Sequence, residues 1–476
     1  MNKLFNSLAG ILGKDNILPG DSVSSDYYHD EALGIPPSEP AVVAFPTQET
    51  EVSALLAFCN EHSIPITARG SGTGLSGASV PPPNGVLISF ERMNKIVEID
   101  IPNHVAVVQP GVTLAELDKA TAEVGLTYPV FPGELGATIG GNIATNAGGM
   151  RAIKYGVTRH NVLGLRACLS TGEIIVTGGK FTKATSGYDL TQLIIGSEGT
   201  LALVTEATLA LQPRPVYSHT LLAPFKTLSE ATNAVPSIIA TGVDPLLLEY
   251  IDNLTMRATT ERVGLDLGLT DEIKQQALAY LIIVLEGNSS TRLDEDGEAL
   301  AELLDRLGAM DVFVLPKKAA TSLIEARESA FFVAKAFGAQ EIMDAVVPRA
   351  SIPVYIEELA QLARESGAMI AGCGHAGDGN IHLSVFLEDV TKRHELVQAA
   401  FRVGIRLGGA ISAEHGIGKE KKAYFLALED PVKIALMRRI KDAFDPKGIL
   451  NPGVIFDPDE TGRTNDESKE QSDEGW

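Results

Sequence analysis

Histidine side chains concentrate near the end of this 476-residue chain. Four of its nine histidines, His375, His382, His394 and His415, fall within 41 residues, where an even spread would place fewer than one. His375 and His382 flank a Gly-Asp-Gly-Asn sequence that is flexible enough to bring their imidazoles together, and Glu414 precedes His415. Two imidazoles and one carboxylate are the ligand set of a catalytic divalent metal with open positions. His375, His382 and Glu414 are therefore candidate ligands for zinc, iron or manganese, which ligand type alone does not separate.

His394 differs from the other three histidines because Lys392, Arg393 and Glu395 surround it. Such a run is typical of a solvated helix, so we expect His394 to lie outside the site. Taken singly, any of these histidines is more often a hydrogen-bonded, partly buried imidazole than a ligand. The clustering is what indicates a site.

Two glycine-rich stretches lie upstream of the histidines: RGSGTGLSG at residues 69–77 and PGELGATIGGNIATNAGGM at residues 132–150. Glycine permits positive φ and lets main-chain N–H groups approach a pyrophosphate without a side chain in the way. We predict that both stretches are backbone cradles for one phosphate-bearing cofactor.

The first stretch contains the spacing G-x-G-x-x-G at Gly72, Gly74 and Gly77, with Glu91 near the distance of a ribose-binding acid. A Rossmann fingerprint must open directly into a helix that holds the pyrophosphate at its N-terminus. Here three consecutive prolines follow at residues 81–83, and they cannot continue a helix. The pattern therefore predicts a cofactor loop outside the Rossmann fold. A tight surface loop is the alternative, and the second glycine-rich stretch argues against it.

Composition excludes several classes of protein. The formal net charge is −22 and no dense basic run occurs, so a nucleic-acid partner is not expected. The three cysteines are far apart, which argues against a disulfide framework and against an iron–sulfur cluster. No apolar run approaches the roughly 18 residues of a membrane span. We expect a cytoplasmic protein, with attachment to a membrane surface left open.

Seven blocks carry a resemblance to a known family: RGSGTGLSGASVP, PGELGATIGGNIATNAGG, KYGVTRHNVLGL, SGYDLTQLIIGSEGTLALVTEATL, CGHAGDGNIHL, ISAEHGIGKEK and FDPKGILNPGVIF. Together they resemble the FAD-linked 2-hydroxy acid oxidoreductases of the vanillyl-alcohol oxidase superfamily. This group includes the flavin subunit of glycolate oxidase, cytochrome-type D-lactate dehydrogenase and D-2-hydroxyglutarate dehydrogenase. The resemblance covers residues 20–457.

The resemblance implies an α+β protein with a two-subdomain FAD-binding domain of p-cresol methylhydroxylase type. Alternating strands and helices beyond residue 215 fit a ferredoxin-like α+β cap domain over the flavin. We expect a lead-in at 1–36, the FAD-binding domain at 37–214, and the cap with the substrate and metal sites at 215–425. A segment at 426–457 then returns to the flavin domain. The last segment, 458–476, is acidic and expected to be disordered.

The family pattern also assigns cofactor residues. It places the FAD pyrophosphate on the first stretch, at Gly70, Ser71, Gly72, Thr73 and Gly74. The rest of the dinucleotide and the flavin edge would lie on the second stretch and three later positions: Pro132, Gly133, Thr138, Gly140, Gly141, Asn142, Asn146, Gly149, Gly199, Val204 and Asn451. No histidine or cysteine stands in the first stretch, so we expect non-covalent FAD.

The resemblance implies the oxidation of a 2-hydroxy acid, in which hydride leaves C2 of the acid for flavin N5 while the hydroxyl proton departs. A free alcohol with a pKa of roughly 16 resists this, and a bound metal lowers the cost. His415 is the expected general base, because a neutral imidazole has a suitable pKa. Neighbours on a strand point to opposite faces, so this role also requires the backbone to bend at Gly416.

Arg327 matches the substrate-binding arginine of the family, and its planar fork suits a carboxylate. Lys335 and Arg349 are further candidates, although each is more often a solvated surface charge, and Asn380 is expected to contact substrate. A dicarboxylate would need a second cation in a family position, which the sequence does not clearly supply. Glycolate or D-lactate is therefore preferred over D-2-hydroxyglutarate.

Two other kinds of protein remain open: a non-catalytic flavin-binding subunit of a larger oxidase, and a metal-dependent hydrolase with an unrelated nucleotide site. The sequence has no haem or iron–sulfur motif of its own. We expect electrons to leave to a quinone, a cytochrome, an electron-transfer flavoprotein or an iron–sulfur subunit, with direct oxidase activity and a homodimer left open.

Overall fold

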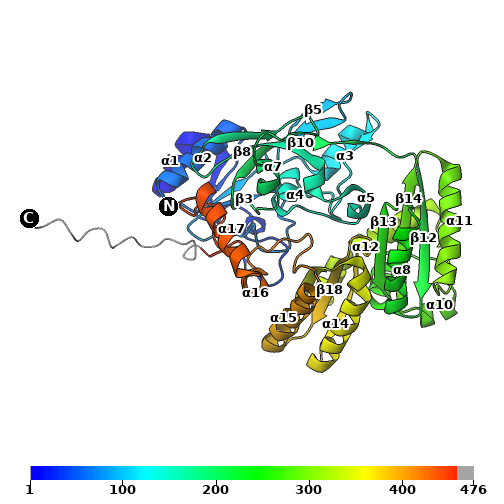
Figure 1. The fold of residues 1–476 in the computed structure, drawn as a ribbon. Coiled ribbons are helices and arrows are strands. Elements are labelled where there is room, and N and C mark those ends of the chain that lie inside the picture. Colours follow the sequence, from blue (N-terminus) through cyan, green and yellow to red (C-terminus); the bar gives the residue numbers. More distant parts are fainter. Residues whose placement is uncertain (1, 458–476) are drawn as a thin grey trace, which may run out of the picture.

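The computed structural model describes residues 2–457, and the acidic tail expected at 458–476 lies outside the described residues. The segments before about residue 215 form one body, and the segments from there to about residue 410 form a second body beside the first (Figure 1). No helix in the described part is both long enough and apolar enough to cross a bilayer.

The first body opens with a small mixed sheet in the order β1-β2-β4-β3. Its strands are β1 (Ile17–Pro19), β2 (Val42–Ala44), β3 (Ile66–Arg69) and β4 (Val86–Ser89). Strands β2 and β3 both pair in parallel with β4, and α2 (Glu49–Glu61) connects β2 to β3 as in a β-α-β unit. Helix α1 (Asn2–Leu12) packs on the same core through Leu8 and Leu12.

A five-stranded antiparallel sheet in the order β5-β6-β10-β8-β9 completes the first body. Along β10, side chains alternate between buried and half-buried, as the period of a strand with one covered face requires. The strands are β5 (Ile96–Asp100), β6 (Val105–Val108), β8 (Val162–Cys168), β9 (Ile174–Gly178) and β10 (Leu203–Ala210), with β7 (Leu126–Thr127) pairing β11 (Gln212–Pro213). The helices are α3 (Leu114–Ala122), α4 (Ile139–Thr145), α5 (Ala152–Tyr155), α6 (Thr158–Asn161) and α7 (Leu190–Ile194).

The second body is built on a seven-stranded antiparallel sheet in the order β15-β12-β14-β13-β17-β18-β16. Its strands are β12 (Tyr217–Phe225), β13 (Leu247–Asp252), β14 (Ala279–Gly287), β15 (Phe313–Val314), β16 (Glu341–Val346), β17 (Met369–Gly374) and β18 (Asn380–Phe386). Its helices are α8 (Leu228–Ala240), α9 (Asn253–Val263), α10 (Asp271–Gln276), α11 (Ser290–Arg306), α12 (Lys317–Glu328), α13 (Ala330–Ala336), α14 (Ile352–Ser366) and α15 (Val390–Arg406).

This sheet contains two ferredoxin-like units, and no internal sequence repeat accompanies this structural repeat. Strands β12, β13, β14 and β15 adopt the order 4-1-3-2 of a β-α-β-β-α-β unit, with α8 and α11 as its helices. Strands β16, β17 and β18 repeat the arrangement, and a bridge between Val346 and Ala410 takes the place of a fourth strand. The units meet where Tyr250 and Ile251 pair with Gly374 and Cys373. The expected α+β class with a ferredoxin-like cap is confirmed.

One expected helix is divided. The sequence predicts a single helix over 319–337, but α12 ends at Glu328 and α13 begins at Ala330. Ser329 closes α12, because its N–H donates to the carbonyls of Glu325 and Ala326 and its hydroxyl donates to Ala326 O at 2.7 Å. Residues of α13 contribute to the lining of a large cavity described below.

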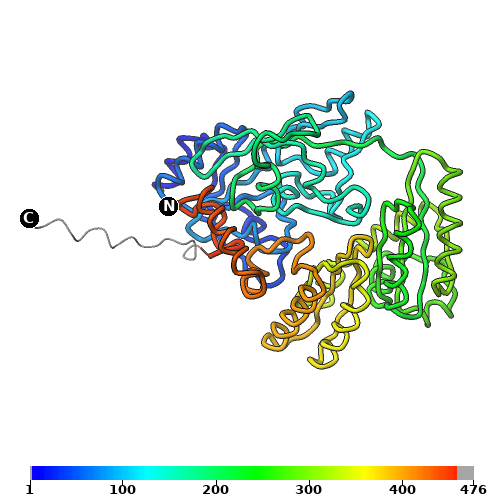
Figure 2. The backbone as a smooth tube through the Cα atoms, in the orientation of Figure 1, coloured from blue at the N-terminus to red at the C-terminus, as the bar shows by residue number. Residues whose placement is uncertain are grey.

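The polypeptide returns to the first body at its end, through α16 (Lys422–Leu428) and α17 (Pro431–Phe444), shown in orange-red beside the blue segments in Figure 2. Lys441 Nζ donates to Thr200 O at 2.7 Å, and Ser170 Oγ donates to Phe444 O at 3.0 Å. Leu450 forms a bridge with Ile66 of β3. Lys441, Phe444 and Leu450 thus contact the first body, whereas Tyr424, Phe425 and Phe456 pack in the core of the second body.

Candidate active site

A cavity of about 220 Å³, here called the glycine-lined pocket, lies between the two glycine-rich stretches. Most residues that the sequence predicts to bind FAD line it: Gly70, Ser71, Gly72, Thr73, Gly74, Pro132, Thr138, Gly140, Gly141, Asn142, Gly199, Val204 and Asn451. Gly133 and Gly149 line the adjoining cavity instead. Asn146 lines neither cavity, because it ends α4 and accepts a hydrogen bond from Arg159 N at 2.9 Å.

Several glycines of this pocket stand where a side chain does not fit. A Cβ at Gly70 would lie 2.1 Å from Thr138 Oγ1, and a Cβ at Gly140 would lie 2.7 Å from Pro110 Cβ. Gly72 has φ +77° and faces the guanidinium of Arg69. Bare main chain therefore lines the cavity on both sides, as a pyrophosphate cradle requires. The residues present fit a dinucleotide such as FAD.

Glu198, which the sequence analysis missed, lines the same pocket and is 4% exposed. Its carboxyl oxygens accept hydrogen bonds from Ile417 N and Gly418 N, both at 2.8 Å. Burial raises its pKa to about 7. Glu198 therefore ties the first body to the loop that carries Glu414 and His415.

The three predicted metal ligands lie together at the junction of the two bodies. Nε2 of His375 and Nε2 of His382 lie 3.3 and 3.1 Å from the same oxygen of Glu414. One ligand atom from each residue falls within 4.8 Å of the others. The other oxygen of Glu414 is buried without a hydrogen-bond partner. Two imidazole nitrogens and an unpartnered carboxylate oxygen that converge in this way fit a divalent metal.

A second acid, Glu249, contacts the ring nitrogen of His375 that faces away from Glu414. Glu249 on β13 is 1% exposed, and its oxygens lie 2.8 and 2.9 Å from His375 Nδ1. It also pairs with Arg327, whose guanidinium nitrogen lies at 2.8 Å. Burial by itself would lower the pKa of His375, but Glu249 and Glu414 raise it well above its ordinary value. A metal would therefore replace a proton here, and a carboxylate behind a ligating histidine fixes the ring orientation.

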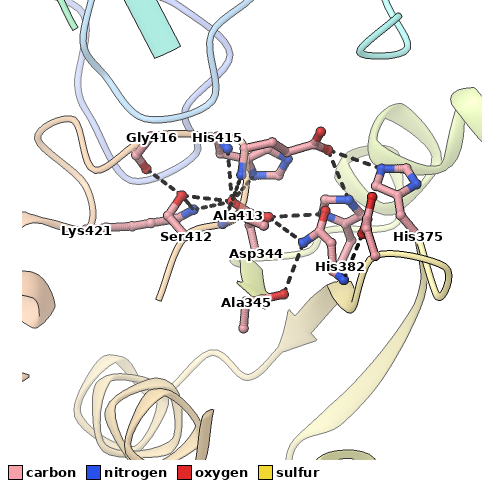
Figure 3. A network of polar contacts seen from close by, with 12 residues as sticks. Asp344, Ala345, His375, His382, Ser412, Ala413, His415, Gly416 and Lys421 are labelled. Carbon is pink, nitrogen blue, oxygen red and sulfur yellow. Dashed lines mark hydrogen bonds and ion pairs between the residues drawn. The ribbon is translucent and has the colours of Figure 1, made fainter. Parts of the chain in front are cut away.

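Asp344 organises the loop that carries Glu414 and His415 (Figure 3). Its Oδ2 accepts hydrogen bonds from three successive main-chain N–H groups, Ala413 at 3.1 Å, Glu414 at 3.2 Å and His415 at 2.9 Å. Ser412 Oγ and Lys421 Nζ bind the same oxygen. Burial by itself would raise the pKa of Asp344, but the surrounding imidazoles, ammonium and N–H groups lower it well below its ordinary value.

This loop explains how two adjacent side chains face one site. Residues 411–416 are not a strand, because their N–H groups turn around Asp344, and Gly416 has φ +84°. The bend expected at Gly416 is therefore present. Asp344, His382 and His415 form a second possible ligand group. The oxygens of Asp344 already accept hydrogen bonds from the loop and from Asn380, which makes Asp344 the poorer metal ligand.

His415 lines both cavities and stacks on His382, with ring centroids 5.0 Å apart. Its Nδ1 lies 3.8 Å from Asp344 Oδ2. Burial, assisted by the positive charge of Lys421, lowers the pKa of His415 to about 4. The imidazole is therefore neutral near pH 7. His394 lies apart from this cluster and stacks on Tyr424, as expected.

The second cavity, here called the chamber, measures about 460 Å³ and adjoins the glycine-lined pocket at Glu414 and His415. Arg327 lines it and is 7% exposed. The other expected substrate-binding residues lie outside its lining. Lys335 forms an ion pair with Glu31 at 2.7 Å, and Arg349 is exposed in a short turn. Asn380 donates its amide to Asp344 Oδ1 at 2.8 Å, so it orients the acid behind the site.

Two protein-family models match most of the sequence. The model of the FAD binding domain matches residues 40–178, and the model of the C-terminal domain of FAD linked oxidases matches residues 214–455. The fold resembles p-cresol methylhydroxylase with substrate bound, with a TM-score of 0.75 and 18% identity over 96% of this chain and 97% of that one. At this identity the likeness concerns the fold alone.

Curated relatives cover almost the whole sequence. An uncharacterized FAD-linked oxidoreductase of Mycobacterium tuberculosis is 54% identical over 96% of this chain and 99% of its own. The D-lactate dehydrogenase of Archaeoglobus fulgidus is 40% identical over 88% and 92%. The glycolate oxidase subunit GlcD of Bacillus subtilis is 39% identical over 89% and 90%. The protein therefore belongs to the FAD-linked oxidases, oxidoreductases with an FAD-binding domain of p-cresol methylhydroxylase type.

Proposed function

We propose that this protein oxidises a D-2-hydroxy acid to the 2-oxo acid with the help of a divalent metal. One observation carries the proposal: Glu414 and His415 line both the glycine-lined pocket and the chamber. The candidate metal ligands and the candidate base thus stand where a flavin in the first cavity would meet an acid in the second.

The protein's own groups divide the work. Bound FAD would accept hydride from C2 of the acid, and a metal held by His375, His382 and Glu414 would polarise its hydroxyl group. Arg327 binds the carboxylate, because its buried Nε lacks a hydrogen-bond partner and can donate to an anion in the chamber. Glu249 keeps Arg327 and His375 in fixed positions, since it contacts both.

His415 takes the hydroxyl proton. Its imidazole is neutral before the reaction, so it has a lone pair available. The lowered pKa makes it a weaker base than a free imidazole, so the proton transfer depends on a metal that lowers the pKa of the hydroxyl group. The imidazolium that forms is stabilised by ionised Asp344, whose Oδ2 lies 3.8 Å from His415 Nδ1. The proton on the hydroxyl oxygen leaves to His415, and the two electrons of the C2–H bond leave with the hydride.

The choice of acid and acceptor is part of the proposal. Relatives named for D-lactate and glycolate make these two the first acids to test. D-2-hydroxyglutarate is the alternative, and it would need a second cation for its distal carboxylate. The reduced flavin would pass its electrons to a quinone, a cytochrome, an electron-transfer flavoprotein or an iron–sulfur subunit.

Anaerobic rapid mixing tests the reaction without knowledge of the acceptor. FAD-loaded protein is mixed with glycolate, D-lactate, L-lactate or D-2-hydroxyglutarate, and bleaching of the flavin absorbance is followed. We expect bleaching by a D-2-hydroxy acid and its loss after removal of the metal with a chelator. Flavin that stays oxidised with every 2-hydroxy acid would refute the proposal and favour a non-catalytic flavin subunit.

A further inference from the structure

The chamber is larger than a small hydroxy acid needs. Its volume of about 460 Å³ lies in the range of cavities that hold drug-sized ligands, roughly 300–1,000 Å³. Lactate has six non-hydrogen atoms and fills roughly 180 Å³, at about 30 Å³ of liquid volume for each water-sized group. The flavin edge that Gly133 and Gly149 would hold takes part of the remaining volume, and the rest would stay unfilled by such a substrate.

One face of the β17–β18 hairpin forms the floor of the chamber. Its side chains become less polar with distance from the imidazoles. Strands β17 and β18 pair Cys373 with His382, then Ala371 with Ser384, and finally Met369 with Phe386. These alternate residues share one face of the hairpin, and all six line the chamber. The distance from His382 to Phe386 is about 13 Å at about 3.4 Å per residue. The surface therefore runs from imidazole to hydroxyl to phenyl over that length.

The rest of the outer lining is also apolar. Phe331 and Phe332 come from α13, Phe337 follows that helix, and Leu254 comes from α9. Phe332, Phe337 and Leu254 are 44, 71 and 52% exposed, so large apolar side chains form the mouth of the chamber. An exposed apolar group of this kind, continuous with a cavity that leads to a reactive centre, is typical of a ligand-binding groove.

Charge in the chamber favours one carboxylate. Among the described residues that line it, Arg327 is the only lysine or arginine, and it lies at the imidazole end beside Glu249. Apart from the imidazoles, the other ionisable side chains of the lining include the acids Glu31, Glu134 and Glu328. A second carboxylate on the substrate would meet apolar or acidic side chains and no cation, which makes a dicarboxylic acid a poor fit.

We infer that the acid bound here is a monocarboxylic D-2-hydroxy acid with an extended apolar side chain, which lies on the face formed by Ala371, Ser384, Met369 and Phe386. This inference rests on the proposed function and replaces lactate or glycolate with a longer substrate. An extended hydrocarbon covers about 1.1 Å per bond, so the floor of about 13 Å accommodates a side chain of about twelve bonds.

A series of acids of increasing length tests the inference. FAD-loaded protein is mixed anaerobically with glycolate, with D-2-hydroxyglutarate and with unbranched D-2-hydroxy acids from lactate to 2-hydroxydecanoate, and kcat/KM for flavin bleaching is measured. We expect kcat/KM to rise about fourfold per methylene, the gain for burying one CH2 group, throughout this series, because its longest side chain still lies within the floor. Calorimetry with the unreactive carboxylates from propanoate to decanoate gives a second readout that needs no turnover, and their affinity should rise in the same way.

A pair of variants tests whether the floor residues cause the rise of kcat/KM with substrate length. Met369→Ser with Phe386→Ser should lower the ratio of long-acid to short-acid kcat/KM, whereas Val432→Ser, an equally conservative change of a 74% exposed residue on α17, should leave the ratio unchanged. A kcat/KM that is highest for glycolate, lactate or D-2-hydroxyglutarate would overturn the inference and leave the proposed reaction intact. Flavin that no acid bleaches, with carboxylate affinity still rising with length, would overturn the proposed reaction and support the apolar chamber.

Discussion

Replacement of Glu249 by Gln should lower the affinity of the site for its metal, although Glu249 is not itself a candidate metal ligand. Glu249 is almost fully buried in β13, contacts His375 Nδ1 through both oxygens and pairs with Arg327. Glutamine keeps the volume and removes the charge. His375 then loses the carboxylate that fixes its ring and makes it a better ligand, while the buried Arg327 loses its charged partner.

Two magnitudes follow from these contacts. Loss of a carboxylate behind a metal-ligating histidine typically costs 10–100-fold in metal affinity, or about 1.4–2.7 kcal/mol. Removal of one partner from a buried ion pair typically costs about 3–5 kcal/mol of stability. The retained amide oxygen can still accept a hydrogen bond, so we expect the Gln variant near the lower end of both ranges.

The assay is a competition titration between FAD-loaded, metal-stripped protein and a chromophoric chelator, with thermal unfolding measured in parallel. Glu341→Gln is the matched control, because Glu341 is a largely buried acid on β16 of the same sheet that bonds to none of the histidines. Metal affinity of Glu249→Gln within twofold of the unchanged protein, with the protein folded, would refute the role assigned to Glu249.

Further predictions follow from the same contacts. His415→Asn should abolish reduction of bound FAD while metal analysis still finds a filled site; loss of the metal would instead make His415 a ligand. Arg327→Lys should raise KM for the acid by on the order of tenfold to a hundredfold, more than it lowers kcat, because a charged hydrogen bond is worth about 1.5–3 kcal/mol. Gly70→Ala should weaken FAD binding, measured by flavin fluorescence, by on the order of tenfold or more, since its Cβ would meet Thr138 Oγ1 at 2.1 Å. Burial, with Glu420 nearby, raises the pKa of Glu341 to about 7, so its contribution to stability is complete below its ordinary pKa and lost as pH rises through 7. Glu341→Gln should therefore gain stability relative to the unchanged protein as pH rises from about 4.5 to 7, by about 3 kcal/mol at most, and equal melting curves of the two proteins at every pH would contradict this.

The residues of the nucleotide cradles could be found in the sequence because their signal is local. A position such as Gly72 has φ +77° and faces Arg69, so glycine is required there whatever the remaining sequence is. The prolines that follow exclude a Rossmann helix by the same local chemistry. The clustering of His375, His382 and Glu414 was also visible, and the structure brings their ligand atoms together.

The fold determines which of the expected substrate-binding residues line the chamber. Lys335, Arg349 and Asn380 have the right chemistry for an anionic substrate, but an ion pair with Glu31, an exposed turn and a bond to Asp344 place them outside the chamber lining. Their roles as substrate ligands stay predictions without support from their positions. Spacing in the sequence does not say which of several cations faces a cavity, because that depends on the direction of each helix.

The sequence alone determined which small residues must line the cofactor cradles and which histidines could share a metal, since both depend on residue type within short stretches. Only the tertiary structure decided that Glu249 supports His375 from 126 residues away and that Asp344 turns the loop of Glu414 and His415. Each of these acids interrupts an apolar strand, which is the one signal that could have exposed them, because a buried carboxylate is costly unless it is paired. Their partners come from distant strands and loops, so these contacts exist only once the seven-stranded sheet has formed.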